Sequence, residues 1–273
     1  MSYKNQNVAV VIPAHNEALC ITKVVEGFKG LCNSDGQALV DTVVVCSNGS
    51  TDNTSELARL AGAKVVQEFR LGYGFACLRA MAALRQTQSA ENLQDAELST
   101  APDIVVFADG DHSVKPNEII QLLDSILANN DLVVGNRVTQ LQEREALSPH
   151  QRFGNALASA LIRFIWNQPI SDLGPFRAIR YSKLLQLDMR DKRFGWTVEM
   201  QVKAIQAGMR YAEVPVTTLR RVGKSKISGT IRGTIGAAIG IFGKIFQLYV
   251  READFLASLK KSTSKVGHQV KPQ

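Results

Sequence analysis

Short runs of β-branched residues alternate with amphipathic stretches, and this alternation constrains the fold more than any other feature. The runs occupy residues 8–14, 41–47, 64–67, 103–109 and 131–137. Several are apolar at consecutive positions, which is typical of strands buried on both faces of a sheet. Helical periodicity marks residues 17–31, 52–61, 74–86 and 117–129 between them. The sequence therefore predicts an α/β fold with a mostly parallel central sheet and helices on both faces.

The second half of the chain is less regular. It predicts helices at residues 150–167 and 197–208 and short strands at 174–179 and 212–218. Residues 87–103 are polar and predict a surface insertion or a frayed helix end. No linker rich in proline, glycine and serine divides the chain, so we expect a single domain over residues 1–230.

The charge of the chain points to an anionic partner. The 273 residues carry a net charge of +7, which fits nucleic acid, an anionic membrane or a phosphorylated substrate. The basic residues at 217–232 lack interleaved aromatic residues. We therefore expect no nucleic-acid partner, and that class stays an alternative that rests on charge alone.

Cysteine spacing and the N-terminus indicate the compartment. The four cysteines form no CxxC pair and no zinc-like cluster, which is typical of reduced thiols in a cytosolic core. The N-terminal residues lack the long apolar region and cleavage site of a signal peptide. We expect a cytoplasmic protein, with peripheral attachment to the cytoplasmic face of a membrane as a further option.

Polar or glycine-bearing segments follow four of the predicted strands. They are PAHNE (13–17), SNGSTDNT (47–54), RLGYG (70–74) and DGDH (109–112). Because the carboxyl ends of parallel strands meet at one edge of a sheet, these segments are expected to form a common ligand site.

The acidic pair Asp109 and Asp111, separated by Gly110, has two interpretations. Two carboxylates so close repel each other unless a cation or a hydrogen-bond network compensates them. Mg²⁺ or Mn²⁺ prefers such oxygen ligands and shares its shell with phosphates and water. A tight acidic turn is the alternative for the pair in isolation.

Two further segments have phosphate-binding character. Gly72 and Gly74 precede a predicted helix, whose N-terminal amides suit a diphosphate, although an ordinary strand–helix turn explains them as well. The stretch RRVGKSKISGT (220–230) carries four basic residues and no acidic one. It is interpreted either as a solvated surface or as a cationic loop over a diphosphate.

Taken together, these motifs resemble the nucleotide-sugar glycosyltransferases of family 2, which have the GT-A fold. VVIPAHNE, SNGSTDNT, DGD and GNR (135–137) occur in that family's order, from Val8 to about Thr230. DLGPFRAIR (172–180) and the basic loop are similar to the branch of dolichyl-phosphate and polyprenyl-phosphate sugar transferases. One departure is clear, because Ser47 and Asn48 stand where the family usually has two acidic residues.

The resemblance implies a donor site in the first half, residues 1–112. Its predicted donor-binding residues are Pro13, Ala14, Glu17, Asn48, Gly72, Asp109, Gly110, Arg221, Ser225 and Lys226. Among them, Asp109 and Asp111 would hold Mg²⁺ or Mn²⁺ on the diphosphate of a nucleotide-sugar, for which a UDP-sugar is favoured. Arg221 would assist catalysis from the basic loop.

The resemblance also implies an acceptor half, residues 113–230, and an inverting transfer. Arg177 and Arg180 are the predicted acceptor-binding residues, and Asp172 and Glu199 complete a catalytic set with Asp111 and Arg221. A lipid phosphate acceptor is largely dianionic at neutral pH and needs no base. A hydroxyl acceptor would need one, with Asp172 and Glu199 as candidates. A catalytically silent nucleotide-sugar-binding subunit is a further alternative.

Residues 231–258 predict an amphipathic helix. On a helical wheel its glycines, Lys244 and Arg251 oppose an apolar side that includes Ile239 and Phe246. Such a helix suits the membrane interface, the enzyme's own core or a dimer contact. Residues 259–273 are polar and basic, and we expect them to be disordered.

Overall fold

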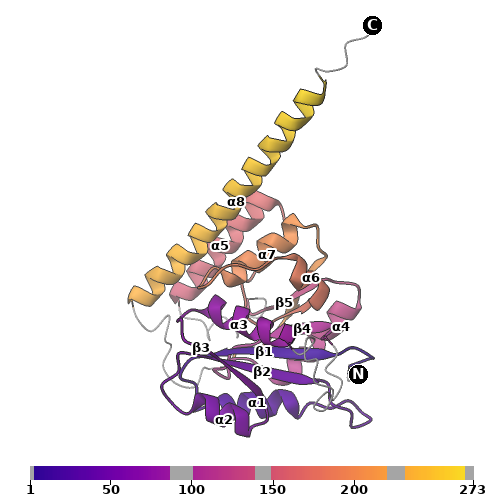
Figure 1. The fold of residues 1–273 in the computed structure, drawn as a ribbon, viewed down its shortest axis with the longest axis vertical. Helices are drawn as coiled ribbons and strands as arrows, with labels where there is room; N and C mark the ends of the chain where they lie inside the picture. The colour runs from indigo at the N-terminus through magenta and orange to yellow at the C-terminus, as the bar shows by residue number, and fades with distance from the viewer. Residues whose placement is uncertain (1–2, 87–100, 139–148, 220–230, 268–273) are drawn as a thin grey trace.

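Seven strands form one sheet in the computed structural model of the protein, in the order β3-β2-β1-β4-β6-β5-β7 (Figure 1). They are β1 (Val8–Ala14), β2 (Thr42–Asn48), β3 (Lys64–Glu68), β4 (Ile104–Phe107), β5 (Leu132–Asn136), β6 (Arg177–Arg180) and β7 (Tyr211–Pro215). Only β6 runs antiparallel to its neighbours, β4 and β5. The structure describes residues 3–86, 101–138, 149–219 and 231–267.

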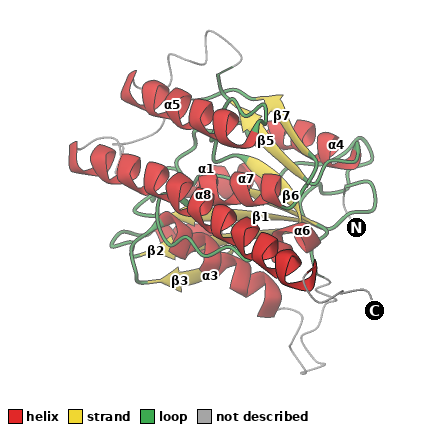
Figure 2. Ribbon diagram, turned by 90° about the horizontal axis from the view of Figure 1, so that it is seen from above, coloured by secondary structure: helices red, strands yellow, loops and turns green. Residues whose placement is uncertain are grey.

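Helices cover both faces of the sheet (Figure 2). One face packs against α1 (Ile21–Lys29), α2 (Thr54–Leu60) and α4 (Ile119–Leu127), which follows the short helix η1 (Pro116–Glu118). The other face packs against α3 (Tyr73–Gln86), α6 (Tyr181–Gln186) and α7 (Trp196–Gln206). Two longer helices, α5 (Pro149–Trp166) and α8 (Ile231–Gly267), pack on α7 as an outer layer.

Strand β1 shows why apolar runs become central strands. Val10 and Ile12 face the core shared with α1 and α4, whereas Ala9 and Val11 face the core shared with α3. All four side chains are buried. Each fully buried valine or isoleucine stabilises the fold by roughly 1.5–3 kcal/mol, so a strand that is apolar on both faces belongs in the middle of the sheet.

The predicted mostly parallel α/β fold is confirmed. The carboxyl ends of the six strands that share one direction lie at one edge of the sheet. The strand predicted at residues 174–179 is found as β6, but its antiparallel direction and the short helix α6 were not predicted from the sequence. Because β6 is reversed, its beginning at Arg177 lies at the same edge, and Arg180 lies at the opposite one.

Helix α8 differs from its prediction in two ways. It continues to Gly267, whereas the sequence predicted a disordered tail from residue 259. Its inner face, which includes the buried Ile245 and Leu248 and the largely buried Lys244, packs on the protein, while Ile239 and Phe246 point outward. Among the described helices, none is long and apolar enough to cross a membrane.

Candidate active site

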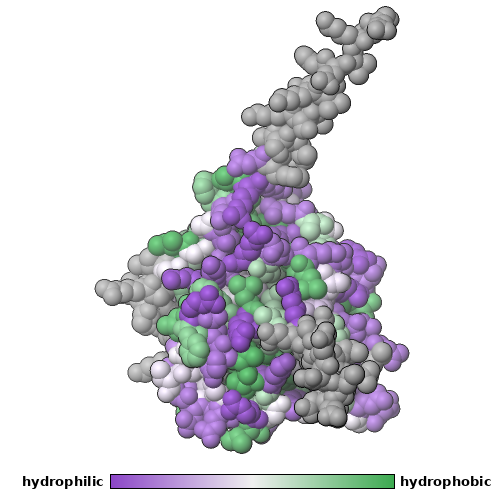
Figure 3. Space-filling view, in the orientation of Figure 1, coloured by the Kyte–Doolittle hydropathy of each residue, from purple (hydrophilic) through white to green (hydrophobic). Residues whose placement is uncertain are grey.

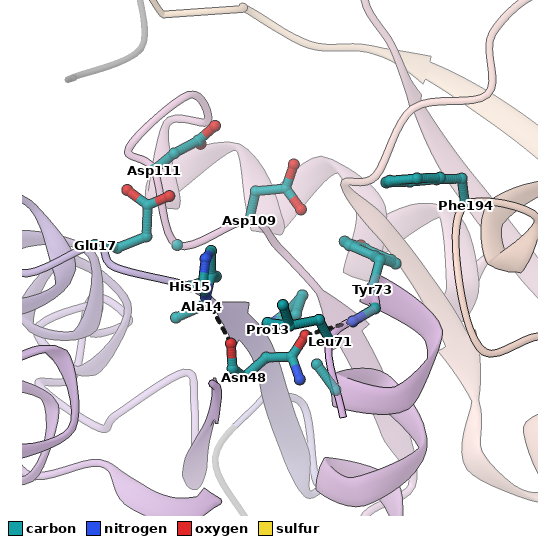
Figure 4. Close-up of a pocket in the computed structure, with 13 residues that line it drawn as sticks. Pro13, Ala14, His15, Glu17, Asn48, Leu71, Tyr73, Asp109, Asp111 and Phe194 are labelled. Carbon is teal, nitrogen blue, oxygen red and sulfur yellow. Dashed lines mark hydrogen bonds between the residues drawn. The ribbon is translucent and has the colours of Figure 1, made fainter. Parts of the chain in front are cut away.

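A cavity of about 330 Å³ opens at the carboxyl edge of the sheet, where β1, β2 and β4 end (Figure 4). Eight residues predicted for the donor or metal site line it: Pro13, Ala14, Glu17, Asn48, Gly72, Asp109, Gly110 and Asp111. His15, Tyr73 and Phe194 join them. The structure therefore brings segments from four parts of the chain to one place, as the strand-end argument predicted.

Asp109 and Asp111 face this cavity from the loop after β4 (Figure 4). Gly110 between them packs so closely that an added Cβ would lie 3.2 Å from the Ala14 side chain. The Ser113 amide donates to Asp111 Oδ1 at 3.0 Å. The following residue, His112, has a φ of +60°, so the backbone turns sharply just after the acidic pair. A side chain at residue 110 would push this loop away from β1.

Tyr73 interacts with the carboxylate of Asp109. Its hydroxyl hydrogen-bonds to Asp109, and burial together with that carboxylate raises the pKa of Tyr73. The ring also lines the cavity. Tyr73 is therefore a positioning residue for Asp109, and the sequence analysis did not identify it.

Asn48 shapes the wall beside the end of β3. Its Nδ2 donates to the carbonyls of Glu68 and Arg70 at 3.1 and 2.8 Å, and its Oδ1 accepts from the Gly72 amide at 2.8 Å. Its own carbonyl bonds with His15 Nδ1 at 2.7 Å. Asn48 thus holds the backbone of the cavity wall, because its carboxamide nitrogen and oxygen both form hydrogen bonds with backbone groups of that wall.

Two of the amides at the start of α3 are already bonded within the protein, which bears on the diphosphate interpretation of the glycines. The Gly74 and Phe75 amides donate to the carbonyls of Arg193 and Lys192, at 3.2 and 3.1 Å. A Cβ on Gly74 would lie 2.1 Å from a backbone oxygen of Asp191. Gly74 is needed because another segment of the chain lies directly against the helix start.

Arg137 is a cation that interacts electrostatically with the acidic pair. It follows β5, and its guanidinium makes a bidentate bond to Asp172, with Nε–Oδ2 at 2.9 Å and Nη2–Oδ1 at 2.8 Å. Burial opposes the charge of Arg137, but Asp172 outweighs it and raises the pKa of Arg137, with smaller contributions from Asp109 and Asp111. The GNR motif contained this residue, yet the sequence analysis assigned it no role.

Asp172 is fully buried in this ion pair. Burial alone would raise the pKa of Asp172, but the Arg137 guanidinium lowers it below its ordinary value. A carboxylate with a lowered pKa and two bonds to an arginine is a weak base. The bonds of Asp172 hold the Arg137 guanidinium in place, and its predicted catalytic role stays a prediction.

The predicted acceptor-binding arginines do not reach the cavity. Arg177 is fully buried, and its guanidinium donates to the carbonyls of Leu173, Gly174 and Thr197. Arg180 donates to the carbonyls of Ile126 and Asn130 at the opposite edge of the sheet. Neither guanidinium lines the donor cavity, and the acceptor-binding role of both arginines stays a prediction.

Glu199 is also engaged within the protein. It is buried on α7, its Oε2 accepts from the amides of Arg190 and Asp191, and its Oε1 pairs with Lys203 at 2.8 Å. These contacts hold the loop before α7, and the predicted role of Glu199 as a base stays a prediction.

Arg221, Ser225 and Lys226 lie outside the described residues. The chain leading to them is described, and the Leu219 amide donates to the Ser113 carbonyl at 2.8 Å. Thr218 pairs with Val114 in the same bridge. Leu219, the last described residue before the basic loop, is thus bonded to Ser113, which follows Asp111 by two residues in the sequence.

Comparison with known proteins identifies the family. Residues 9–187 match the family described as Glycosyl transferase family 2. A protein of Mycobacterium tuberculosis (strain ATCC 25618 / H37Rv) named as an uncharacterized glycosyltransferase is 32% identical over 241 residues, which is 85% of this chain and 94% of the relative. The chain belongs to glycosyl transferase family 2.

Other relatives of this glycosyltransferase have more specific names. A dolichyl-phosphate hexose transferase of Haloferax volcanii is 28% identical over 87% of this chain and 92% of its own. A polyprenol monophosphomannose synthase of Mycolicibacterium smegmatis is 27% identical over 82% of each chain.

The solved structure of glucosyl-3-phosphoglycerate synthase from Mycobacterium tuberculosis, in complex with Mn²⁺, UDP and phosphoglyceric acid, is similar with a TM-score of 0.67 and 21% identity. The match covers 90% of this chain and 79% of that chain. The glycosyltransferase therefore has the predicted GT-A fold.

Proposed function

We propose that this glycosyltransferase moves a sugar from a UDP-sugar to the phosphate of a polyprenyl-type lipid, with inversion at the anomeric carbon. The observation that carries the proposal is the cavity at the strand ends that Asp109 and Asp111 line, with Arg137 close enough to interact electrostatically with both carboxylates. Acidic residues suit a metal-bound diphosphate donor, and a nearby guanidinium suits a phosphate acceptor. The names of the Haloferax and Mycolicibacterium relatives support the lipid phosphate.

The donor set fits Mg²⁺ or Mn²⁺. Asp109 and Asp111 supply hard oxygen ligands, and the described residues contain no cluster of three or more His, Cys, Asp or Glu side chains that could complete a protein-only site. Mg²⁺ is usually bound through one or two carboxylates plus substrate phosphates and water. When bound, the ion would neutralise charge on the departing diphosphate. The solved structure similar to this chain contains Mn²⁺ and UDP, which supports both assignments.

The surroundings of the acidic side chains favour an acceptor that needs no base. Asp172 is bound to Arg137, and Glu199 is bound to two amides and Lys203. A phosphate monoester has a second pKa of about 6, so it attacks as a dianion at neutral pH. Its oxygen forms the new bond to the anomeric carbon as the bond to the nucleoside diphosphate breaks. Arg137 would orient the attacking phosphate.

The outer faces of α5 and α8 support attachment to a membrane, where such an acceptor resides. Phe153 and Phe164 on α5 and Ile239 and Phe246 on α8 are 70%, 87%, 68% and 67% exposed. The two helices lie side by side (Figures 1 and 2), and Figure 3 shows apolar groups along the edge where α8 runs. No acidic residue occurs in α5 or in residues 231–251 of α8. An apolar surface without acidic residues suits an anionic bilayer.

Thermal stabilisation tests the donor assignment. UDP with Mn²⁺ at about 100 times its Kd should stabilise the protein by about 2.7 kcal/mol, whereas UDP without metal should stabilise it less. GDP with Mn²⁺ serves as the matched nucleotide control. Asp111→Asn should abolish the metal-dependent part. If no nucleoside diphosphate stabilises the protein in the presence of Mn²⁺, the proposed donor site is wrong.

The acceptor is tested by comparing a polyprenyl phosphate with the corresponding polyprenol as substrates for the same labelled UDP-sugar. We expect transfer to the phosphate alone, because the alcohol would need a base that Asp172 and Glu199 do not provide. Transfer to the alcohol at a comparable rate would show instead that the acceptor is a hydroxyl group.

A further inference from the structure

The segment of residues 190–195, which precedes α7, lies directly against the start of α3. The Lys192 and Arg193 carbonyls accept hydrogen bonds from the Phe75 and Gly74 amides. These are two of the amides that a helix start leaves without an intrahelical partner. The position of the 190–195 segment therefore determines how the first turn of α3 is held.

The same segment forms part of the cavity wall. The Phe194 ring lines the cavity opposite the β1 strand end, on the side of Tyr73 (Figure 4). A Cβ on Gly72, which also lines the cavity, would lie 2.3 Å from the Lys192 carbonyl oxygen. A shift of the segment by a few tenths of an ångström would therefore move two parts of the donor wall together.

Helix α8 holds this segment from the other side. Lys244 Nζ lies 3.0 Å from Asp191 Oδ2, and both side chains are largely buried, at 14% and 13% exposed. A Cβ on Gly195 would lie 2.6 Å from Asp191 Oδ2 and 3.0 Å from Lys244 Cβ, so the helix and the segment touch without space between them. Gly240 also lies beside Phe194, less tightly, since an added Cβ there would make an ordinary van der Waals contact with the Phe194 side chain at 3.4 Å.

Lys244 also compensates the negative charge of Asp191, in addition to packing against the segment. Asp191 and Glu199 bring two carboxylates to the segment, and the Asp191 amide itself donates to Glu199 Oε2. Lys203 pairs with Glu199, and Lys244 pairs with Asp191. Without Lys244, the largely buried Asp191 carboxylate would lose its paired cation and keep the Arg193 amide bonded to its Oδ1. Removing one partner of a largely buried ion pair leaves the other charge uncompensated, which favours a rearrangement of the segment that carries it.

We propose that Lys244 and Asp191 are positioning residues of the donor site, through which α8 holds the 190–195 segment against the start of α3. Helix α8 then contributes to donor binding without contacting the donor, in addition to its outward apolar face. The inference rests on the proposed function for its nucleotide readout, whereas its structural readout does not require any ligand.

Amide hydrogen exchange of the unliganded protein gives the structural readout. In Lys244→Met, which keeps the length of the side chain, exchange at Gly74 and Phe75 should accelerate by on the order of tenfold, because the carbonyls that hold these amides are no longer fixed. Arg251→Met is the matched control, since Arg251 is an exposed cation on the same helix. Lys244→Arg should restore slow exchange because it keeps the charge at the same position.

Nucleotide affinity gives the functional readout. Lys244→Met should weaken UDP binding in the presence of Mn²⁺ by on the order of tenfold. The control Arg251→Met should bind UDP as tightly as the wild type. If the wild type binds no nucleoside diphosphate, the proposed function fails, and the exchange measurement still decides the present inference. Asp191→Asn provides a second variant with the same expected exchange result if Lys244→Met does not fold. Unchanged exchange at Gly74 and Phe75 in a folded variant would overturn the inference, whatever its melting temperature.

Discussion

Asn48 illustrates how much of the donor wall depends on the hydrogen-bonding pattern of one side chain. Its two N–H groups are directed at the Glu68 and Arg70 carbonyls, and only its oxygen accepts, from Gly72. A carboxylate has no N–H groups and would face both carbonyls with negative charge. The family's usual acidic residue would therefore require a different arrangement of this wall.

Asn48→Asp is consequently expected to destabilise the protein by about 2–3 kcal/mol, because two buried carbonyls lose their donors. UDP affinity should fall with it. Urea unfolding measures the first effect and calorimetric titration the second. Ser47→Ala is the matched control, since the Ser47 hydroxyl is buried without a hydrogen-bond partner and its removal should be nearly neutral. Equal stability of Asn48→Asp and the wild type would contradict the assigned bonds.

Arg137 provides a second prediction for a single residue. Arg137→Met should lower kcat by on the order of 100-fold while UDP binding is retained, because the proposed acceptor phosphate loses its guanidinium. The double variant Arg137→Met/Asp172→Asn removes the carboxylate that would otherwise stay buried alone, and it should remain as slow. Steady-state kinetics with varied lipid phosphate provide the measurement.

Arg180→Met is the control for that experiment, because this arginine lies at the other edge of the sheet. It should alter stability without altering the KM for the acceptor. A kinetic defect of equal size in Arg137→Met and Arg180→Met would show that neither guanidinium acts at the site.

Strand β6 shows where sequence reasoning succeeded and where it did not. The acidic pair was located correctly beside β1 because a buried strand and its following loop are both local features of the sequence. The roles of Arg177 and Arg180 depend on the direction in which β6 enters the sheet, which is set by pairing with β4 and β5. That pairing is a long-range property, so the sequence did not show that Arg177 and Arg180 lie at opposite edges of the sheet.

The glycines at the start of α3 show the same dependence on contacts between distant parts of the chain. The sequence placed Gly72 and Gly74 before a helix, and in the structure Gly72 precedes α3 while Gly74 is its second residue. It could not show that the 190–195 segment, more than a hundred residues later, occupies the space that each missing side chain leaves. Periodicity predicts elements, whereas the contacts between distant elements decide which backbone groups stay available to a ligand.

The beginning of β5 gives a prediction about acid stability. Asp131 accepts hydrogen bonds from Arg210, which lower the pKa of Asp131 against the opposing effect of burial. Because the pKa in the folded state lies below the unfolded value of about 3.9, the stabilisation is complete above that pH. It is lost as the pH falls through the folded pKa.

Asp131→Asn should therefore cost about 1 kcal/mol at pH 7, a figure kept small because the Arg210 side chain is 50% exposed. The difference from the wild type should shrink at pH 3. Urea unfolding at both pH values gives the comparison. Asp35→Asn, at an exposed position, should change stability little at either pH. A constant difference for Asp131→Asn across this range would contradict the assignment.

At the scale of the whole molecule, three layers meet around the donor cavity. The sheet supplies the acidic pair, α3 supplies Tyr73, and the segment before α7 supplies Phe194. Helix α8 joins this segment on its inner face and presents Ile239 and Phe246 on its outer face. The same helix therefore connects the donor wall with the surface that we propose for the membrane.

That surface is tested by binding to vesicles. The wild type should bind vesicles that contain anionic lipid, and binding should weaken as salt rises, because the electrostatic part of the attraction is screened. Phe164→Ser/Phe246→Ser should reduce partitioning by on the order of 100-fold, since each of the two phenylalanines inserted into the interface contributes roughly 1.5 kcal/mol or more. Leu60→Ser is the matched control, because Leu60 is 77% exposed on α2, away from α5 and α8 (Figure 1). Cosedimentation across a series of lipid concentrations measures all three proteins. Equal losses in the double variant and the control would show that α5 and α8 do not form the membrane surface, and UDP affinity measured in solution should stay unchanged in both.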